Sequence, residues 1–133
     1  MKVLSIKEPF ASLVCNGIKK IETRSWKTNY KGELYIHASL SKNDVKDKKR
    51  LNKLISLLPD YYELNYGNII CKCNLANCIY MTEEYIDQIK KDSIEYLCGN
   101  YTLGRYAWIL TDVKILNEKI PAKGKLGIWN YDI

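Results

Sequence analysis

The segment Gly17-Ile18-Lys19-Lys20-Ile21-Glu22-Thr23-Arg24-Ser25-Trp26-Lys27 is the densest polar stretch of the chain. It places basic residues, a carboxylate, two hydroxyls and an indole at a predicted helix-to-strand junction, and such junctions commonly carry function. Arg24 offers a planar fork for a phosphate or a base edge, Lys19 a mobile point charge, and Glu22 an acceptor that can also orient either cation. Composition alone favours a plainer alternative, an exposed hairpin with surface ion pairs.

Patterns on either side of this segment predict a helix before it and strands after it. Pro9 suits the first turn of a helix, apolar residues follow at helical spacing, and Gly17 supplies the left-handed position that ends it. The β-branched and aromatic residues of 21–26 and 33–38 predict two strands. One face of the second strand is apolar and the other carries His37, so we expect His37 to point away from the core.

The second half of the chain predicts further helices and strands. Ser41-Lys42-Asn43-Asp44 has the form of a capping box, and helical spacing continues from it until Pro59. Thr82 predicts the start of another helix, which extends towards Gly99. Strands are predicted at 69–79, 105–112, 113–120 and 128–129. The whole pattern predicts an α+β fold, a small mixed β-barrel or curled sheet flanked by about three helices. No repeat or linker divides residues 1–133, so we expect a single domain.

The composition predicts a soluble, basic protein. Lysine and arginine number 21 against 15 acidic residues, and the net charge of +6 favours polyanionic partners, although the Lys46–Arg50 cluster is typical of a solvated helix face. No stretch approaches the roughly 20 consecutive apolar residues of a membrane span, and the N-terminus has no signal core, which predicts a cytoplasmic location. The five cysteines are an odd number and lie mostly in apolar runs, so we expect reduced core thiols, no metal site and no cofactor.

Residues 17–24 fit the G-x-K-x-x-E-x-R signature of ASCH domains, the activating-signal-cointegrator homology group of the PUA-like superfamily. Leu4–Ala11 resembles the opening segment of that family, Leu34–Ser39 its following strand, and Gly104–Trp108 with Lys123–Asn130 its C-terminal part. The resemblance covers nearly the whole chain. It implies a PUA-like β-barrel with helices around it and a cleft beside the signature segment.

Similarity to this family implies a ligand of nucleic-acid type and leaves two functions open. Members are described as binding RNA, DNA or modified nucleosides, one group hydrolyses N4-acetylcytidine, and ribonuclease activity is attributed to a member. The signature lysine of the hydrolase group corresponds to Lys19. Three residues later that group has a threonine, where this chain has Glu22. A carboxylate beside the lysine favours its charged form, whereas a nucleophile needs the neutral amine. We therefore expect a noncatalytic RNA- or modified-nucleoside-binding domain. The alternative is a metal-independent hydrolase, an N4-acetylcytidine amidohydrolase or a ribonuclease, that uses Lys19.

The expected cleft has basic and aromatic components. We expect Lys19, Glu22 and Arg24 at its centre, with Trp26 stacking on a base. Further candidates for ligand or phosphate contacts are Ser25, Lys27, His37, Arg105, Lys123 and Lys125. Trp108 lies in an apolar run and is expected in the core, whereas Trp26 between polar residues is expected to be exposed. Two of these assignments have simpler alternatives, a solvated turn for the two C-terminal lysines and a histidine bonded to its neighbours for His37.

Overall fold

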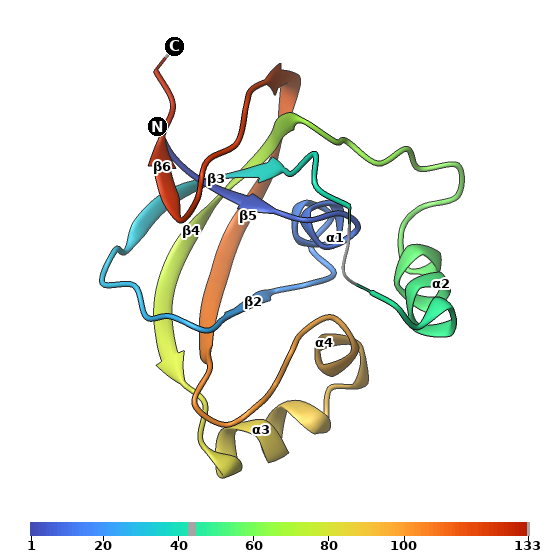
Figure 1. Cartoon of the computed structure of the whole chain (residues 1–133), viewed down its shortest axis with the longest axis vertical. Coiled ribbons are helices and arrows are strands. Elements are labelled where there is room, and N and C mark those ends of the chain that lie inside the picture. Colours follow the sequence, from blue (N-terminus) through green and yellow to red (C-terminus); the bar gives the residue numbers. More distant parts are fainter. Residues whose placement is uncertain (43–44, 133) are drawn as a thin grey trace.

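Two long antiparallel strands form the centre of the sheet in the computed structural model, which describes residues 1–42 and 45–132. They are β4 (Asn68–Tyr80) and β5 (Tyr106–Pro121), and register shifts along their pairing bend them. The other strands are β1 (Lys2–Ile6), β2 (Ile21–Arg24), β3 (Gly32–Ala38) and β6 (Ile128–Asn130). The six strands lie in the order β2-β5-β4-β3-β1-β6, with β1 and β3 parallel, and the sheet curls into a half-barrel (Figure 1). This mixed, curled sheet confirms the predicted α+β fold class.

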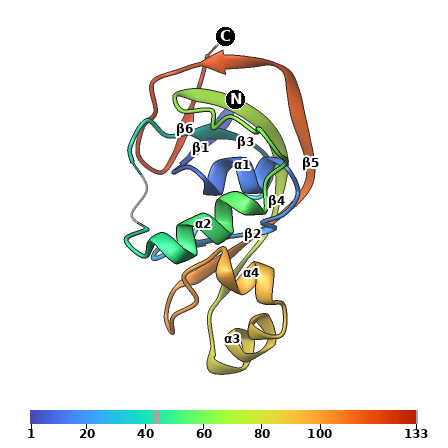
Figure 2. The same cartoon turned by 90° about the vertical axis from the view of Figure 1, so that its right-hand side faces the viewer.

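Helices fill the curl and cover one end of the sheet. They are α1 (Phe10–Cys15), α2 (Lys48–Ser56), α3 (Glu83–Lys90) and α4 (Ser93–Leu97). α1 lies against the concave face, where Ala11 and Val14 belong to the same core cluster as Trp108 (Figures 1 and 2). α2 packs over α1 through Leu54 and Leu13. α3 contributes to a separate cluster where β2, β4 and β5 approach their ends. Apolar clusters therefore lie on both sides of α1. Trp108 is fully buried in the cluster between α1 and the sheet, as predicted.

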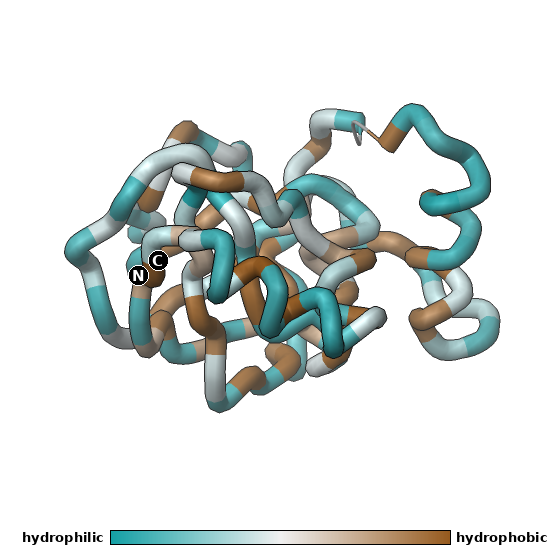
Figure 3. The backbone as a smooth tube through the Cα atoms, turned by 90° about the horizontal axis from the view of Figure 1, so that it is seen from below, coloured by the Kyte–Doolittle hydropathy of each residue, from teal (hydrophilic) through white to brown (hydrophobic). Residues whose placement is uncertain are grey.

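The start of α2 differs from its prediction. Asn43 and Asp44 of the capping box Ser41–Asp44 lie outside the described residues, and the helix begins only at Lys48. Asp47 caps it by accepting hydrogen bonds from the backbone of the first turn at 2.9 and 3.3 Å. The segment that leads into α2 is largely hydrophilic (Figure 3). Asp47, directly before the first helical residue, therefore sets the start of α2.

The predicted helix from Thr82 towards Gly99 is divided into two. It begins as predicted, because the Thr82 hydroxyl accepts a hydrogen bond from the backbone of Tyr85 at 3.2 Å. Asp92 then caps a new helix by accepting from the backbone of Glu95 at 3.1 Å. An aspartate inside a helical pattern competes with the helix for backbone donors, which gives α3 and α4 instead of one helix. The described part of the chain therefore has four helices, against about three predicted.

β3 shows the two faces that its alternation predicts, with one difference. Leu34, Ile36 and Ala38 are fully buried in the core. His37 lies on the opposite face but is only 1% exposed. Its cover comes from a segment 85 residues away in sequence, where the carbonyl of Ala122 lies 2.8 Å from His37 Nε2. Alternation along β3 correctly predicts the face on which His37 lies. It does not predict that the segment at Ala122 covers this face.

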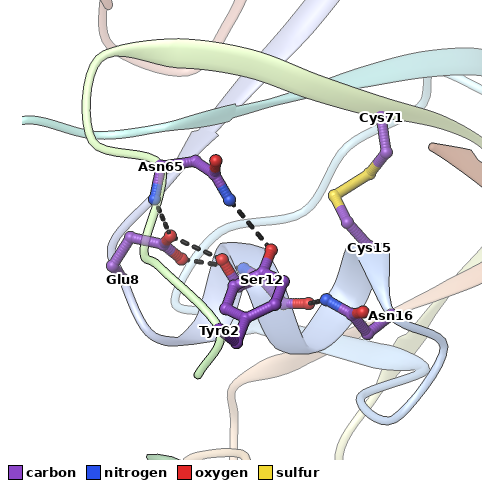
Figure 4. The surroundings of a disulfide bond; sticks show 7 residues. All are labelled: Glu8, Ser12, Cys15, Asn16, Tyr62, Asn65 and Cys71. Carbon is purple, nitrogen blue, oxygen red and sulfur yellow. Dashed lines mark hydrogen bonds between the residues drawn. A yellow bond between two sulfur atoms is a disulfide. The ribbon is translucent and has the colours of Figure 1, made fainter. Parts of the chain in front are cut away.

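A disulfide between Cys15 and Cys71 joins α1 to β4 (Figure 4). This corrects the prediction of reduced thiols for these two cysteines, while Cys73, Cys78 and Cys98 are free. The two partners are 56 residues apart in sequence, and the fold brings their Cα atoms to 5.6 Å. A cross-link that closes a loop of this length stabilises a fold by about 4 kcal/mol on chain-entropy grounds. Because disulfides are rare in the reducing cytosol, this bond gives no support to the expected cytoplasmic location.

A buried carboxylate fixes the start of α1. Glu8 is fully buried and accepts hydrogen bonds from the backbone and the hydroxyl of Ser12 at 2.8 and 2.6 Å (Figure 4). It also accepts from the backbone of Asn65 at 2.8 Å. Three donors compensate the carboxylate for its lost hydration, so the first turn of α1 is held at one position relative to the segment before β4.

Candidate functional site

A cleft of about 690 Å³ opens where the half-barrel fails to close, between β1 and β2. Its walls come from the ends of these strands, the start of α1, one residue of α2, the segment after α4 and the loop at 123–127. Seven of the predicted site residues line it, namely Lys19, Glu22, Arg24, His37, Arg105, Lys123 and Lys125. The fold therefore gathers residues from both ends of the chain around one opening.

Lys19, Glu22 and Arg24, here termed the inner wall, are placed by the turn between α1 and β2. Gly17 takes a φ of +74°, and the next two backbone amides donate to the carbonyl of Leu13 at 3.0 and 3.1 Å. This fixes the backbone at Lys19. Alternation along β2 then places Glu22 and Arg24 on the same face of the strand.

The inner wall is one continuous line of charged contacts. Lys19 is 1% exposed, and its Nζ donates to the carbonyl of Cys98 at 2.7 Å and lies 3.5 Å from Glu22 Oε1. The other oxygen of Glu22, Oε2, lies 3.0 Å from Arg24 Nε and 2.8 Å from Arg24 Nη2. Glu22 thus stands between two cations, and these contacts offset the cost of burying an ammonium group.

Arg24 also bridges the seam of the half-barrel. Its Nη2 donates to the carbonyl of Ser5 at 2.9 Å, which connects β2, at one edge of the sheet, to β1 near the other. A side chain therefore makes the connection here that backbone hydrogen bonds make in a closed barrel. The guanidinium is both a structural tie and part of the cleft lining.

His37 lies on the far side of the cleft in a short hydrogen-bonded chain. Trp129 Nε1 donates to Ser5 Oγ at 3.1 Å, and Ser5 Oγ lies 2.9 Å from His37 Nδ1. Since a carbonyl only accepts, His37 Nε2 donates to Ala122 at 2.8 Å. A neutral imidazole protonated at Nε2 satisfies every member of this chain. Both ring nitrogens are occupied, so His37 supports the neighbouring loop.

That loop, Lys123-Gly124-Lys125, is here termed the lip. A Cβ atom added at Gly124 would lie 2.8 Å from Ser5 Oγ and 2.9 Å from His37 Cε1, closer than real Cβ atoms come to other atoms. Only glycine allows the loop to rest directly on the Ser5–His37 pair. The flanking lysines are exposed and line the cleft. The lip therefore carries two solvated cations on a closely seated backbone.

Two arginines complete the basic lining. Arg50, from α2, donates from Nη2 to the carbonyl of Leu97 at 2.7 Å. Arg105 donates to the carbonyls of Asn100 and Thr23, both at 3.2 Å. Sequence reasoning missed Arg50, because the Lys46–Arg50 cluster was assigned to a solvated helix face. Only α2 packing beside the segment after α4 turns this residue towards the cleft.

Phe10 forms an apolar floor between two of the cations. Lys19 Nζ lies 5.6 Å and the guanidinium carbon of Arg50 5.7 Å from the centre of its ring. Contacts of this kind attract a cation to the ring face. Phe10 also lines the cleft, which sequence reasoning did not anticipate. In the sequence, Phe10 belongs to the segment Leu4–Ala11, which resembles the opening segment of ASCH domains and was not assigned to the site.

The charge of the cleft is strongly one-sided. Among the described lining residues, seven are basic and one, Glu22, is acidic. The basic residues are Lys7, Lys19, Arg24, Arg50, Arg105, Lys123 and Lys125. All three arginines of the chain belong to this set, compared with four of its 18 lysines. Arginine is thus concentrated at the cleft to a degree that its abundance in the chain does not explain.

Burial changes the acidity of two groups behind the inner wall. Burial raises the pKa of the Cys98 thiol to about 11, and the nearby Lys19 and Glu95 have smaller, opposing effects. The thiol is therefore protonated at neutral pH and offers no thiolate nucleophile. Burial also raises the pKa of Glu95, although hydrogen bonds from the backbone of Lys20 at 2.9 Å and Ile21 at 3.3 Å lower it. Glu95 thereby fixes the start of β2.

Three predicted site residues lie beyond the end of β2, outside the cleft lining. They are Ser25, Trp26 and Lys27, and all three are exposed. The Trp26 ring meets the buried Trp108 ring edge-on, with 4.7 Å between centroids. The exposure of Trp26 is as predicted, but its side chain does not belong to the cleft lining.

Within residues 1–42 and 45–132 there is no cluster of three or more side chains suited to hold a metal ion. The same residues contain no helix that is long and apolar enough to cross a membrane.

Comparisons with known proteins agree with the motifs. The ASCH domain family model matches residues 4–120. The chain is 28% identical over 129 residues to activating signal cointegrator 1 of Homo sapiens, a match that covers 97% of this chain and 22% of the human protein. It is also 28% identical over 141 aligned residues to the Mus musculus protein of the same name, with the same coverage of each. The chain thus spans about a fifth of the length of these curated relatives. By the family match over most of its length, this chain belongs to the ASCH domain family.

Proposed function

We propose that this chain, acting as a single domain, binds RNA or another nucleic acid through phosphate groups held in the cleft. The observation that carries the proposal is the convergence of all three arginines on a cleft whose described lining has seven basic residues and one acidic residue. Arginine presents a planar set of donors that matches phosphate oxygens. Among the described residues, none of the three Nη1 groups has a hydrogen-bond partner, so each can donate to a ligand.

The charge of the cleft favours a phosphate-bearing ligand over a free modified nucleoside. A nucleoside without phosphate is neutral and would bring no negative charge to the basic side chains of the cleft. A polynucleotide supplies one negative charge per phosphate and releases bound counterions when cations replace them. The base or the modification would then determine specificity, while phosphates supply most of the affinity.

The contacts of Lys19 support binding more than hydrolysis. Its Nζ donates to a carbonyl at 2.7 Å and pairs with Glu22 at 3.5 Å, which are contacts of an ammonium group. A neutral amine acting as a nucleophile would lose part of both interactions. Incubation with N4-acetylcytidine and with labelled RNA, using the native protein and Lys19→Ala, tests the alternative. We expect no turnover above background with either substrate.

Fluorescence anisotropy with a short labelled single-stranded RNA at increasing salt tests the binding proposal. The logarithm of the affinity should fall linearly with the logarithm of salt, by about 0.7 per phosphate contact. Arg50→Gln and Arg105→Gln should each weaken binding several-fold and reduce this slope. Lys114→Gln and Lys119→Gln, on exposed positions of β5 outside the cleft, are the matched controls and should bind normally.

Absent binding would contradict the proposal, and so would binding that does not respond to salt. Thermal denaturation of each variant separates a loss of contact from a loss of fold, because both arginines also donate to backbone carbonyls.

A further inference from the structure

Three exposed or half-exposed aromatic side chains, Trp26, Tyr106 and Tyr80, lie next to the cleft and are here termed the aromatic row. Arg24 of β2 pairs in register with Tyr106 of β5, which pairs with Tyr80 of β4. Residues paired across antiparallel strands project from the same face. The Tyr80 and Tyr106 rings meet edge-on with 5.5 Å between centroids, and Tyr80 is 55% exposed. The row therefore begins beside a residue that lines the cleft.

Trp26 extends this surface from the segment after β2. Its ring rests on Trp108, which is two residues from Tyr106 and on the same face of β5. Trp108 Nε1 donates to the carbonyl of Trp26 at 3.4 Å, so backbone and ring of Trp26 are both tied to the core. Trp26 nevertheless remains 38% exposed. Strands β4 and β5 and the buried Trp108 hold the rings of the row in place. Part of each ring nevertheless remains accessible to a ligand.

Basic residues connect the aromatic row to the cleft. Arg24 belongs to the cleft lining and to the cross-strand row, and Arg105 lines the cleft directly before Tyr106. Lys27 follows Trp26 and is exposed. A chain of phosphates held in the cleft could thus continue past these cations with its bases over the rings. The combination of a basic groove with aromatic faces is the general requirement for binding unpaired bases.

We infer that the ligand is a single-stranded nucleic acid, whose bases stack on the aromatic row as the strand leaves the cleft. The inference rests on the proposed function, since the cleft supplies the phosphate contacts. In a duplex the faces of the bases are stacked on each other and unavailable, so a duplex gains nothing from Trp26, Tyr106 or Tyr80. The row adds affinity that does not depend on salt.

The test compares Tyr80→Ala with Tyr61→Ala, using a labelled oligoadenylate. Tyr61 is fully exposed in the segment between α2 and β4 and is the matched control. Removing a stacked ring should weaken binding of the single strand at least about five-fold without changing the salt slope. The same strand annealed to oligouridylate should bind both variants and the native protein alike. Tyr61→Ala should match the native protein throughout.

Tryptophan fluorescence gives a second readout that does not depend on Tyr80. Of the three tryptophans, Trp108 and Trp129 are buried and Trp26 is exposed, so oligoadenylate should quench Trp26 emission. Trp26→Phe, which keeps a ring against Trp108, should abolish the quenching.

Normal single-strand affinity of Tyr80→Ala, with no quenching of Trp26, would overturn the inference. If Arg50→Gln and Arg105→Gln still weaken binding in that case, the proposed function stands and the bases lie elsewhere. If the native protein binds no oligonucleotide, both the proposed function and this inference fail.

Discussion

The inner wall and the lip both present cations to the same cleft, yet their surroundings are opposite. Lys19 in the inner wall is 1% exposed, contacts a carbonyl and a carboxylate, and faces Phe10. Lys123 and Lys125 in the lip are exposed and, within the described residues, form no ion pair. The protein itself compensates the first kind of cation and leaves the second to a ligand. Some cations of the cleft therefore stabilise the fold, whereas others are available to bind a ligand. Substitutions can distinguish the two groups.

Among these substitutions, Glu22→Gln should lower the stability of the protein most, because it removes the ion pairs of the inner wall. The substitution removes the carboxylate between Lys19 and Arg24 and leaves a buried ammonium without its counter-charge. Loss of one partner of a buried ion pair is costly, so the free energy of unfolding should fall by about 3 kcal/mol. Chemical denaturation followed by circular dichroism measures this.

Glu33→Gln is the control for that substitution. Glu33 pairs with Lys72 at 3.7 Å, but their side chains are 60% and 39% exposed. An exposed pair of this kind contributes at most about 1 kcal/mol. Equal destabilisation by the two substitutions would show that Glu22 acts as an ordinary surface carboxylate, and would erase the distinction between inner wall and lip.

Gly124→Ala should displace the lip while leaving the inner wall in place. The added methyl would collide with Ser5 Oγ and the His37 ring, at 2.8 and 2.9 Å. Overpacking of this kind costs about 1–3 kcal/mol. We expect a moderate fall in thermal stability together with weaker binding of single-stranded RNA. Unchanged stability would mean that the loop yields freely and is not seated on His37.

Lys123→Ala and Lys125→Ala should have the smallest effect on stability and a clear effect on binding. Exposed side chains without protein partners change the free energy of unfolding by no more than about 0.5 kcal/mol. Each substitution should nevertheless reduce the salt slope of RNA binding by about 0.7 if its lysine contacts a phosphate. Normal slopes for both variants would remove the lip from the ligand site and leave only the arginines.

Local sequence patterns predicted the fold well where neighbours in sequence decide the structure. The faces of β3, the cap at Thr82, the turn at Gly17 and the burial of Trp108 all follow from spacing or composition. The family resemblance further implied a cleft beside the signature segment. In the structure, seven of the predicted site residues line one cleft.

The remaining features depend on contacts between distant segments. Nothing near Cys15 indicates Cys71 as its partner, and nothing near Arg50 indicates the carbonyl of Leu97. The burial of His37 depends on Ala122 in the same way. These contacts depend on the curl of the sheet and the packing of α2. The spacing of residues along the sequence therefore does not predict them.

The disulfide has a topological consequence for the cleft. Cys15 and Cys71 close a covalent ring that contains the whole inner wall, His37 and Arg50, while Arg105 and the lip lie outside it. The exposed stretch at 46–49 lies within the ring. A protease that cut there would open the ring without releasing a fragment, because the two pieces would stay joined through sulfur. Only reduction would separate them, so the inner wall can survive a broken backbone for as long as its surroundings remain oxidising.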